Sequence, residues 1–279
     1  MPISSSPPDL KTLIQAALGP SSVVQDAPSV RRLYARDLAD IPALLRRAFF
    51  RAVPDLVVQP ANPEAVRALV AFAVESGVPL VPRGAGSSGF WGSVPSAGGI
   101  AVDLSPMDAI ESIEPETRRI TVQAGATWHD VDRKAGQFGL TLYTTPSSRF
   151  STVAGWVATG GYGIDSFSHG HLSEQVEAIE VVTPEGGGVL RTLGPEDPDY
   201  DLFSGTEGQF GIITRVTLRL RPKPQRTRAF LLQFEGPEPV FSTIERIVAD
   251  GHHLSSRTMK RKRQRESRSP HPMESSRKA

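Results

Sequence analysis

The sequence predicts an α+β fold, in which short strands outnumber helices and do not alternate with them strictly. Apolar residues recur at helical spacing in only a few segments, whereas short runs with strand character are numerous. The chain also has 24 prolines and 25 glycines, which divide it into many short elements. A strict β-α-β alternation would instead require a helix after almost every strand.

Two segments near the N-terminus have clear helical signals. Residues 9–18 place their apolar side chains on one helical face, and Gly19 follows as a stop. Asn62 can cap a second helix, because its side chain accepts from free N–H groups of the first turn, and Gly77 ends that helix. Residues 20–55 are mixed and give no clear pattern. Strands are expected at 57–60, 78–81 and 100–104.

The second half of the chain is expected to form antiparallel strands. Residues 205–220 give a turn and then a long strand of alternating apolar residues, which Pro222 ends. Residues 184–188 are rich in glycine and separate two strand-like runs, which is typical of a hairpin. Thr127 can cap a helix that reaches about Phe138. Further strands are expected at 109–114, 119–124, 140–143, 177–183, 189–192 and 229–234, and a last helix at 239–249.

Composition excludes several classes of protein. The chain has no cysteine, so it has neither a disulfide framework nor a thiolate metal site. The pair His169 and His171 has no third ligand in view, and no metal is expected. No apolar run is long enough for a transmembrane helix, and the N-terminus lacks the pattern of a secretory signal. A cytoplasmic location is therefore expected.

The net charge of +1 hides two unlike parts. Residues 252–279 hold nine Lys or Arg against two Asp or Glu, which gives +7, and the remainder holds 22 against 28, which gives −6. The tail has few apolar residues and no periodicity, so it is expected to be disordered. Its basic run at 260–263 has no interleaved aromatic residue for stacking on bases, and no nucleic-acid partner is expected.

A glycine cluster follows the strand expected at 78–81. Residues 84–89 spell G-x-G-x-x-G, which in a dinucleotide-binding fold must open a helix. The next ten residues, 90–99, contain three glycines and a proline, so no helix is expected there. Successive small residues can still point their N–H groups into one concavity that binds phosphate. The residues alone leave this nest and a plain Gly/Ser surface turn as alternatives.

Three ordered motifs resemble one known family. They are PRGAGSSG at 82–89, PSSRFSTVAGWVATGGYG at 146–163 and GTEGQFGIITRVTLRLRP at 205–222. Together they resemble the PCMH-type FAD-binding domain of the FAD-linked oxidases, the family of vanillyl-alcohol oxidase and p-cresol methylhydroxylase. The most similar branch is that of glycolate oxidase, D-lactate dehydrogenase and alkylglycerone-phosphate synthase. The resemblance covers about residues 55–225.

The resemblance implies a division of the chain into domains. The FAD-binding domain has two α+β subdomains, a small parallel β-α-β portion and a larger mixed sheet, with FAD between them. Family members usually continue into a substrate-binding domain, which here is expected to be largely missing through truncation or a frameshift near Gly251. The expected parts are an N-terminal helical extension at 1–54, the FAD-binding domain at 55–225 (subdomains at about 55–105 and 106–225), the start of the substrate domain at 226–251 and the disordered basic tail at 252–279.

The same resemblance implies which residues bind the cofactor. The first motif corresponds to the pyrophosphate loop, the second to two segments along the flavin and its phosphates, and the third to main chain at the adenine end. The expected FAD-binding residues are Pro82, Arg83, Gly84, Ala85, Gly86, Ser87 and Ser88 in the first motif; Pro146, Ser147, Ser148, Ser151, Thr152, Thr159, Gly160, Gly161, Tyr162 and Gly163 in the second; and Glu207, Gly208, Gly211, Ile212 and Ile213 in the third.

The expected function is that of an FAD-dependent oxidoreductase acting on a small substrate such as a 2-hydroxy acid. Phe90 and Trp91 follow the first loop where some members carry a histidine bound to FAD, so non-covalent FAD is expected. The alternative is an FAD-binding module without turnover, because the domain that normally holds the substrate and the catalytic side chains is expected to be largely missing; no catalytic residue is named for this reason. His169 and His171 lie beside the second motif, either near the flavin or as ordinary loop residues. Tyr34 and Asp37 form a Y-x-x-D pattern that we interpret as structural.

Overall fold

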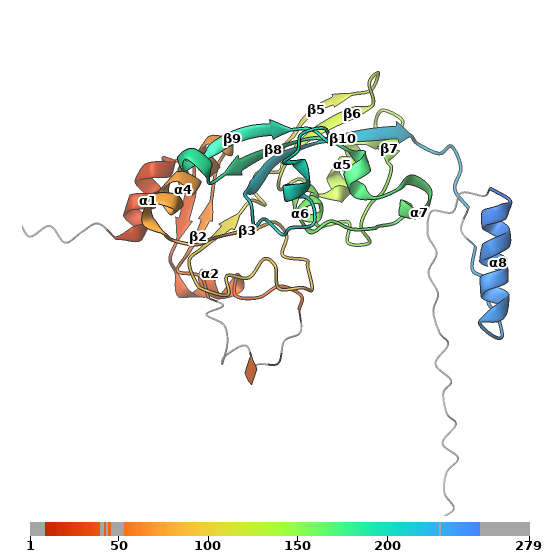
Figure 1. The fold of residues 1–279 in the computed structure, drawn as a ribbon, viewed down its shortest axis with the longest axis horizontal. Coiled ribbons are helices and arrows are strands. Elements are labelled where there is room, and N and C mark those ends of the chain that lie inside the picture. The colour runs from red at the N-terminus through yellow and green to blue at the C-terminus, as the bar shows by residue number, and fades with distance from the viewer. Residues whose placement is uncertain (1–8, 40–41, 43, 46–52, 229, 252–279) are drawn as a thin grey trace, which may run out of the picture.

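Two β-sheets with helices packed on them make up the fold (Figure 1). The computed structural model describes residues 9–39, 42, 44–45, 53–228 and 230–251. The first sheet has four strands from the N-terminal part of the chain, and the second has six strands from the part that follows. One cluster of buried apolar side chains extends through both. The fold is therefore of the α+β class that the sequence predicts.

The first sheet combines three parallel strands with one antiparallel edge strand. The strand order is β1 (Val23–Gln25), β2 (Leu56–Gln59), β4 (Ile100–Asp103) and β3 (Leu80–Arg83). β2, β4 and β3 run parallel, and β1 pairs with β2 in the opposite direction. Every residue of β4 is buried, as in the centre of a parallel sheet. Through β1, the segment 1–54 contributes a strand to this sheet, beyond the helices that the sequence analysis expects there.

Two capped helices, α1 (Leu10–Leu18) and α4 (Pro63–Ser76), pack against each other. The Asp9 side chain accepts a backbone N–H from the first turn of α1 at 2.8 Å. The Asn62 side chain does the same for α4 at 2.9 Å. Pro63 is the first residue of α4, where its missing N–H costs no hydrogen bond. Both predicted helices are confirmed. They could be predicted because their capping residues are local signals in the sequence.

The second sheet is antiparallel and is organised around its longest strand, β10 (Ile212–Pro222). Val216, Leu218 and Leu220 are buried, and the residues between them are not, which confirms the alternation seen in the sequence. The predicted hairpin is also confirmed, with a 3-10 turn, η2 (Glu185–Gly187), between its strands. The order is β5 (Ile110–Glu114), β6 (Arg119–Gln123), β10, β8 (Val176–Thr183) and β9 (Val189–Leu193), with β7 (Leu140–Leu142) also on β10.

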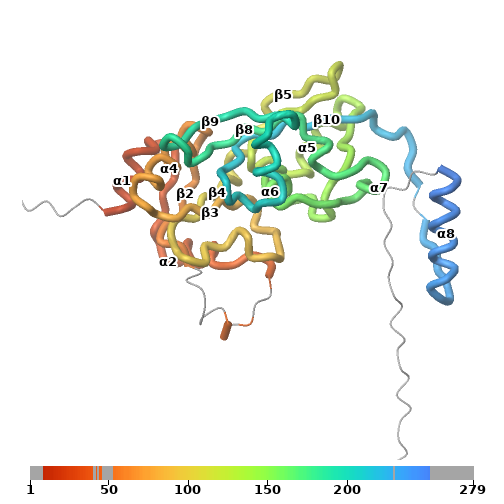
Figure 2. The backbone as a smooth tube through the Cα atoms, in the orientation of Figure 1, coloured from red at the N-terminus to blue at the C-terminus, as the bar shows by residue number. Residues whose placement is uncertain are grey.

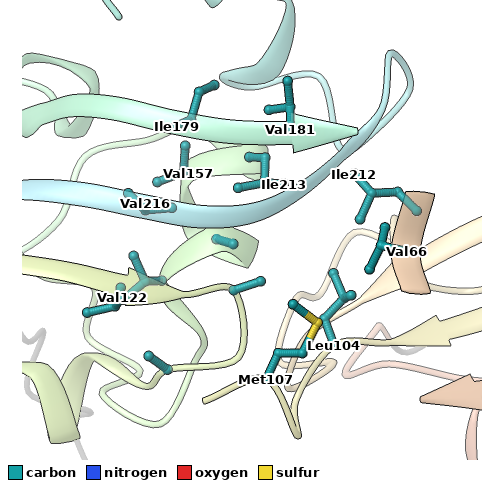
Figure 3. Packing of buried hydrophobic residues seen from close by; sticks show 14 of the residues in the cluster. Val66, Leu104, Met107, Val122, Val157, Ile179, Val181, Ile212, Ile213 and Val216 are labelled. Carbon is teal, nitrogen blue, oxygen red and sulfur yellow. The ribbon is translucent and has the colours of Figure 1, made fainter. Parts of the chain in front are cut away.

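The core continues from the second sheet to the first. Helix α6 (Val153–Thr159) packs on β10, and its Val157 lies beside Val216 (Figure 3). On the other side, Val66 of α4 and Ile212 of β10 lie together (Figure 3). Helix α5 (Trp128–Gly136) contacts β7. Burial of such side chains stabilises each contact by roughly 1.5–3 kcal/mol, and it fixes the position of the loops at this junction.

Helix α6 is a structural element that the sequence analysis does not predict. It lies inside the second glycine motif, where we expected only a glycine-rich segment. Its seven residues are held by tertiary packing, since Val153, Ala154 and Val157 are all buried. The remaining short helices are α2 (Pro28–Leu33), α7 (Ser166–His169), η1 (Leu172–Gln175) and η3 (Tyr200–Phe203).

The strand predicted at 229–234 is wrong. Residues 230–234 have no regular structure, and Leu231 is 98% exposed. Apolar character alone does not make a strand here, because no strand among the described residues offers hydrogen bonds to this segment. Residue 229 and the tail 252–279 lie outside the described residues. The predicted last helix is confirmed as α8 (Glu238–Ala249), which follows β10 apart from the two sheets and has no buried residue (Figure 2).

Among the residues that the structure describes, none of the helices has both the length and the apolar character needed to cross a bilayer.

Candidate functional site

The first glycine motif forms an irregular loop directly after β3. Residues 84–99 contain no helix, which confirms that the G-x-G-x-x-G pattern does not open a dinucleotide-binding helix here. Gly86 has a φ of +62°, a left-handed conformation that favours glycine. Within the described part of the chain, no hydrogen bond leaves the backbone N–H groups of residues 85–88. These four consecutive N–H groups, here called the donor row, therefore have no partner among the described residues and could donate to a ligand.

Arg83 places a positive charge beside this row. Its guanidinium lies 5.4 Å from the ring centroid of Tyr34 and so close to Gly86 that a side chain there would overlap it. Its Nη1 donates to the carbonyl and hydroxyl oxygens of Ser93 at 3.4 and 3.3 Å, and the guanidinium has further donors on Nε and Nη2. Burial lowers the pKa of Arg83 from its ordinary value, although an arginine stays charged at neutral pH.

The second motif touches the first through Thr152. A methyl group at Gly84 would overlap the Thr152 hydroxyl, so glycine is required there by the close approach of the two segments. Thr152 is almost fully buried and begins α6. Ser147 and Ser148, in contrast, are exposed, and Pro146 is buried. The motif thus joins the first loop at one end and presents two serines to solvent at the other.

The segment after α6 is held by hydrogen bonds from its backbone. The N–H of Gly161 donates to Nε2 of His171 at 2.8 Å, and the N–H of Gly163 donates to the Ser166 hydroxyl at 2.8 Å. Nδ1 of the same ring lies 3.2 Å from the Ser173 backbone nitrogen and 2.8 Å from the Ser173 hydroxyl, so both ring nitrogens have partners. Tyr162 is 79% exposed, and its ring meets that of His171 edge-on at 5.0 Å. This places His171 directly against the second motif.

Two residues of this region pack within the protein itself. A side chain at Gly163 would overlap the Thr145 carbonyl and lie 2.6 Å from the Trp156 ring, so the protein itself requires glycine there. Gly163 is one of the expected FAD-binding residues, and the packing around it gives an additional reason for glycine at this position. Trp156 meets Trp128 edge-to-face at 5.1 Å, in agreement with a packing role rather than ring stacking on a ligand.

The third motif also contacts the first. A side chain at Gly208 would lie 2.7 Å from the Pro82 ring, and the N–H of Glu207 donates to the Ala158 carbonyl at 2.8 Å. The side chains of Ile212 and Ile213 are buried in the core, so only their main chain can face a ligand. The three motifs, far apart in the sequence, therefore meet around Pro82 and Gly84.

A cavity of about 200 Å³ lies next to the second motif, where Thr145, Arg149 and Ile164 line it, and none of the expected cofactor-binding residues is part of its lining. Its lining includes two arginines that are already paired with carboxylates. Arg149 lies 2.7 Å from Asp132, and Arg221 lies 3.4 Å from Asp165.

The sequence analysis missed the contacts that an N-terminal segment makes with the first loop. Asp37 accepts the Trp91 N–H at 2.8 Å, and the Leu38 N–H donates to the Ser88 carbonyl at 2.9 Å. Tyr34 donates its hydroxyl proton to Asp103 at 2.7 Å. The Y-x-x-D pattern of Tyr34 and Asp37 is the signal for these contacts in the sequence. We interpret it as structural, but the sequence does not identify the residues that Tyr34 and Asp37 contact.

Comparison with known proteins places these features in context. The sequence profile of the FAD binding domain matches residues 54–192. The glycolate oxidase subunit GlcD of Bacillus subtilis is 31% identical over 207 residues, which cover 72% of this chain and 44% of that protein. The D-lactate dehydrogenase of Anaerostipes hadrus is 29% identical over 214 residues, 75% of this chain and 45% of that protein.

A similar fold is found among solved structures. An alkyldihydroxyacetonephosphate synthase superposes with a TM-score of 0.64 at 25% sequence identity, over 73% of this chain and 41% of that one. The chain thus spans somewhat less than half the length of the relatives it matches.

Proposed function

Residues 54–192 belong to the FAD binding domain family, and on this premise we propose that the chain is an FAD-linked oxidoreductase that holds FAD without a covalent bond. The observation that carries the proposal is the donor row at residues 85–88 beside Arg83, in a loop that contacts the other two glycine motifs through Gly84 and Pro82. Pyrophosphate is an anion, and backbone N–H donors beside a cation are well suited to bind it.

We assign the parts of FAD to the motifs by their chemistry. The first loop would bind the pyrophosphate, because its donors are backbone N–H groups and Arg83 adds charge. Residues 146–152 and 159–163 would flank the flavin, and main chain at 207–213 would meet the adenine end. The acidic balance of residues 1–251, −6, means that attraction for the anionic FAD must be local.

Non-covalent binding is supported by the residues that follow the first loop. Phe90 and Trp91 have no nucleophilic nitrogen or oxygen for attachment to a flavin. His171 lies against the second motif, but its Nε2 already accepts the Gly161 N–H. Denaturation with acid or urea should therefore release all of the flavin, and flavin that stays with the denatured polypeptide would contradict this part of the proposal.

Bound FAD supplies the hydride acceptor for oxidation of a small substrate, and we propose a 2-hydroxy acid because two relatives are a glycolate oxidase subunit and a D-lactate dehydrogenase. The task of the chain's own residues is to bind and orient. The Gly161–His171 and Gly163–Ser166 hydrogen bonds would hold the backbone that flanks the flavin. The packing of α6 on β10 would hold the start of that segment in place.

A second candidate is an FAD-binding module without turnover. It is favoured by the span of the match, since the relatives are about twice as long as the segment they share with this chain. One experiment separates the two. The purified chain is titrated with FAD by flavin fluorescence, and the complex is then mixed with glycolate, D-lactate and other 2-hydroxy acids without oxygen.

Each result of that experiment has a distinct meaning. Loss of the visible flavin absorbance with one acid supports the oxidoreductase. A stoichiometric FAD complex that no acid reduces, but that dithionite does, supports the module. A chain that is folded by circular dichroism and binds no FAD contradicts both.

A further inference from the structure

The first glycine loop has no regular secondary structure. A segment that precedes the matched domain makes two hydrogen bonds to it. Asp37 Oδ2 accepts the N–H of Trp91 at 2.8 Å. The N–H of Leu38 donates to the carbonyl of Ser88 at 2.9 Å. These two bonds fall at the end of the donor row and just after it. The matched FAD binding domain begins only at residue 54, so neither contact belongs to it.

Tyr34 anchors this segment to the first sheet. Its hydroxyl donates to Asp103 Oδ2 at 2.7 Å, and the same oxygen accepts from the Gln59 side chain at 2.8 Å. Asp103 is only 4% exposed and ends β4, the central strand of the parallel group. The ring of Tyr34 also lies under the guanidinium of Arg83. The segment therefore links a rigid strand to both the loop and its cation.

The effect of these contacts is to order the loop before any ligand is present. A flexible loop rich in glycine and serine loses conformational entropy when it binds a ligand, and a loop that is already held in one conformation loses less. Contacts that fix the loop beforehand therefore raise its affinity for the ligand. Asp37 also favours the charged form of the Arg83 guanidinium, although burial has the larger and opposite effect on the pKa of Arg83.

We propose that Tyr34, Asp37 and Leu38, here called the N-terminal clasp, are positioning residues that hold residues 84–91 in the conformation that receives the FAD pyrophosphate. This inference rests on the proposed function, because it assigns the loop to FAD. It adds a role for a segment that precedes the matched domain.

The principal test is Asp37→Ala, which removes the acceptor of the Trp91 N–H. We expect hydrogen–deuterium exchange at the Trp91 amide to become faster in the full chain without FAD. We also expect the Kd for FAD to rise about tenfold, since the loop must then be ordered on binding. Asp37→Asn keeps a side-chain oxygen as acceptor and should restore most of the affinity. Unchanged FAD affinity in Asp37→Ala overturns the proposal.

Asp9→Ala is the matched control. It also removes a carboxylate that accepts a backbone N–H, at 2.8 Å, but it does so at the start of α1. We expect some loss of stability and no change in FAD affinity. An equal loss of affinity in Asp9→Ala and Asp37→Ala would mean that general destabilisation is the cause, and would overturn the clasp.

Tyr34→Phe is a second variant that tests the proposal if Asp37→Ala does not fold. It keeps the ring under Arg83 and removes only the hydroxyl that reaches Asp103. The FAD dissociation rate should rise about threefold or more, together with exchange at Trp91. No change in either quantity overturns the proposal. Failure of the unsubstituted chain to bind FAD overturns the proposed function itself, which is a different result from unchanged affinity in the clasp variants.

Discussion

The hydroxyl of Thr152 fills the space that a side chain at residue 84 would need, so Gly84 and Thr152 hold the first and second glycine motifs in direct contact. The two residues lie in different parts of the fold, one after β3 of the first sheet and the other at the start of α6 beneath the second. Their contact is the place where the two sheets set the geometry of the candidate cofactor site.

Gly84→Ala is expected to destabilise the protein by about 1–3 kcal/mol, because the new methyl group must displace Thr152. Thr152→Ala removes the hydroxyl in the way and should recover part of that loss in the double variant. A double-mutant cycle in urea should give an interaction energy of at least about 1 kcal/mol. Strictly additive losses would mean that the two residues do not compete for the same space.

Gly86→Val is expected to abolish FAD binding while the sheets remain folded. Valine is strained at a φ of +62°, and its side chain would push Arg83 from its place beside the donor row. Flavin fluorescence titration measures the loss, and circular dichroism verifies the fold. Gly89→Ala is the matched control in the same loop, since a side chain there meets nothing within 4 Å and should leave FAD affinity unchanged. Stoichiometric flavin in Gly86→Val would show that the pyrophosphate lies elsewhere.

Arg83→Gln is expected to raise the Kd for FAD by about tenfold to a hundredfold, as for loss of a hydrogen bond to a charged group. The affinity of the unsubstituted chain should fall more steeply with salt than that of the variant, because only the former has the charge to screen. Arg133→Gln, on the exposed face of α5, should change neither quantity. A salt dependence that persists unaltered in Arg83→Gln would assign the attraction to another cation.

Tyr34 gives a prediction for alkaline pH. Burial and then the hydrogen bond to Asp103 raise the pKa of Tyr34 above its ordinary value of 10.0, so the folded state favours the neutral phenol. That contribution to stability is complete below pH 10 and is lost as the pH rises through the pKa of the folded state. Unfolding free energies of the unsubstituted chain and Tyr34→Phe should therefore converge above pH 10. A constant difference between them would contradict the raised pKa.

Local signals explain which elements the sequence predicts well. The α4 helix has its own start and stop in Asn62 and Gly77, and β10 shows its alternation in consecutive residues. Neither depends on knowing what lies across the core. The family motifs behave in the same way, because each is contiguous, and they lead to the FAD binding domain that the comparison identifies.

Elements that depend on distant partners could not be predicted. Helix α6 contains Gly155 and follows no strong cap, and it exists because β10 covers its apolar side. The apolar residues around Leu231 have strand character, but no strand in the described residues lies beside them. The contact of Asp37 with Trp91 joins residues 54 positions apart, and only the fold brings them together.

The central position of β10 in the second sheet affects folding during synthesis and the choice of fragments for expression. β6, β7 and β8 all bond to this one strand, which is synthesised after them. During translation the second sheet cannot close until Pro222 has left the ribosome. A fragment that stops at residue 192, where the family match ends, would expose the edges of three strands and would aggregate. The shortest piece suitable for expression therefore extends through Pro222.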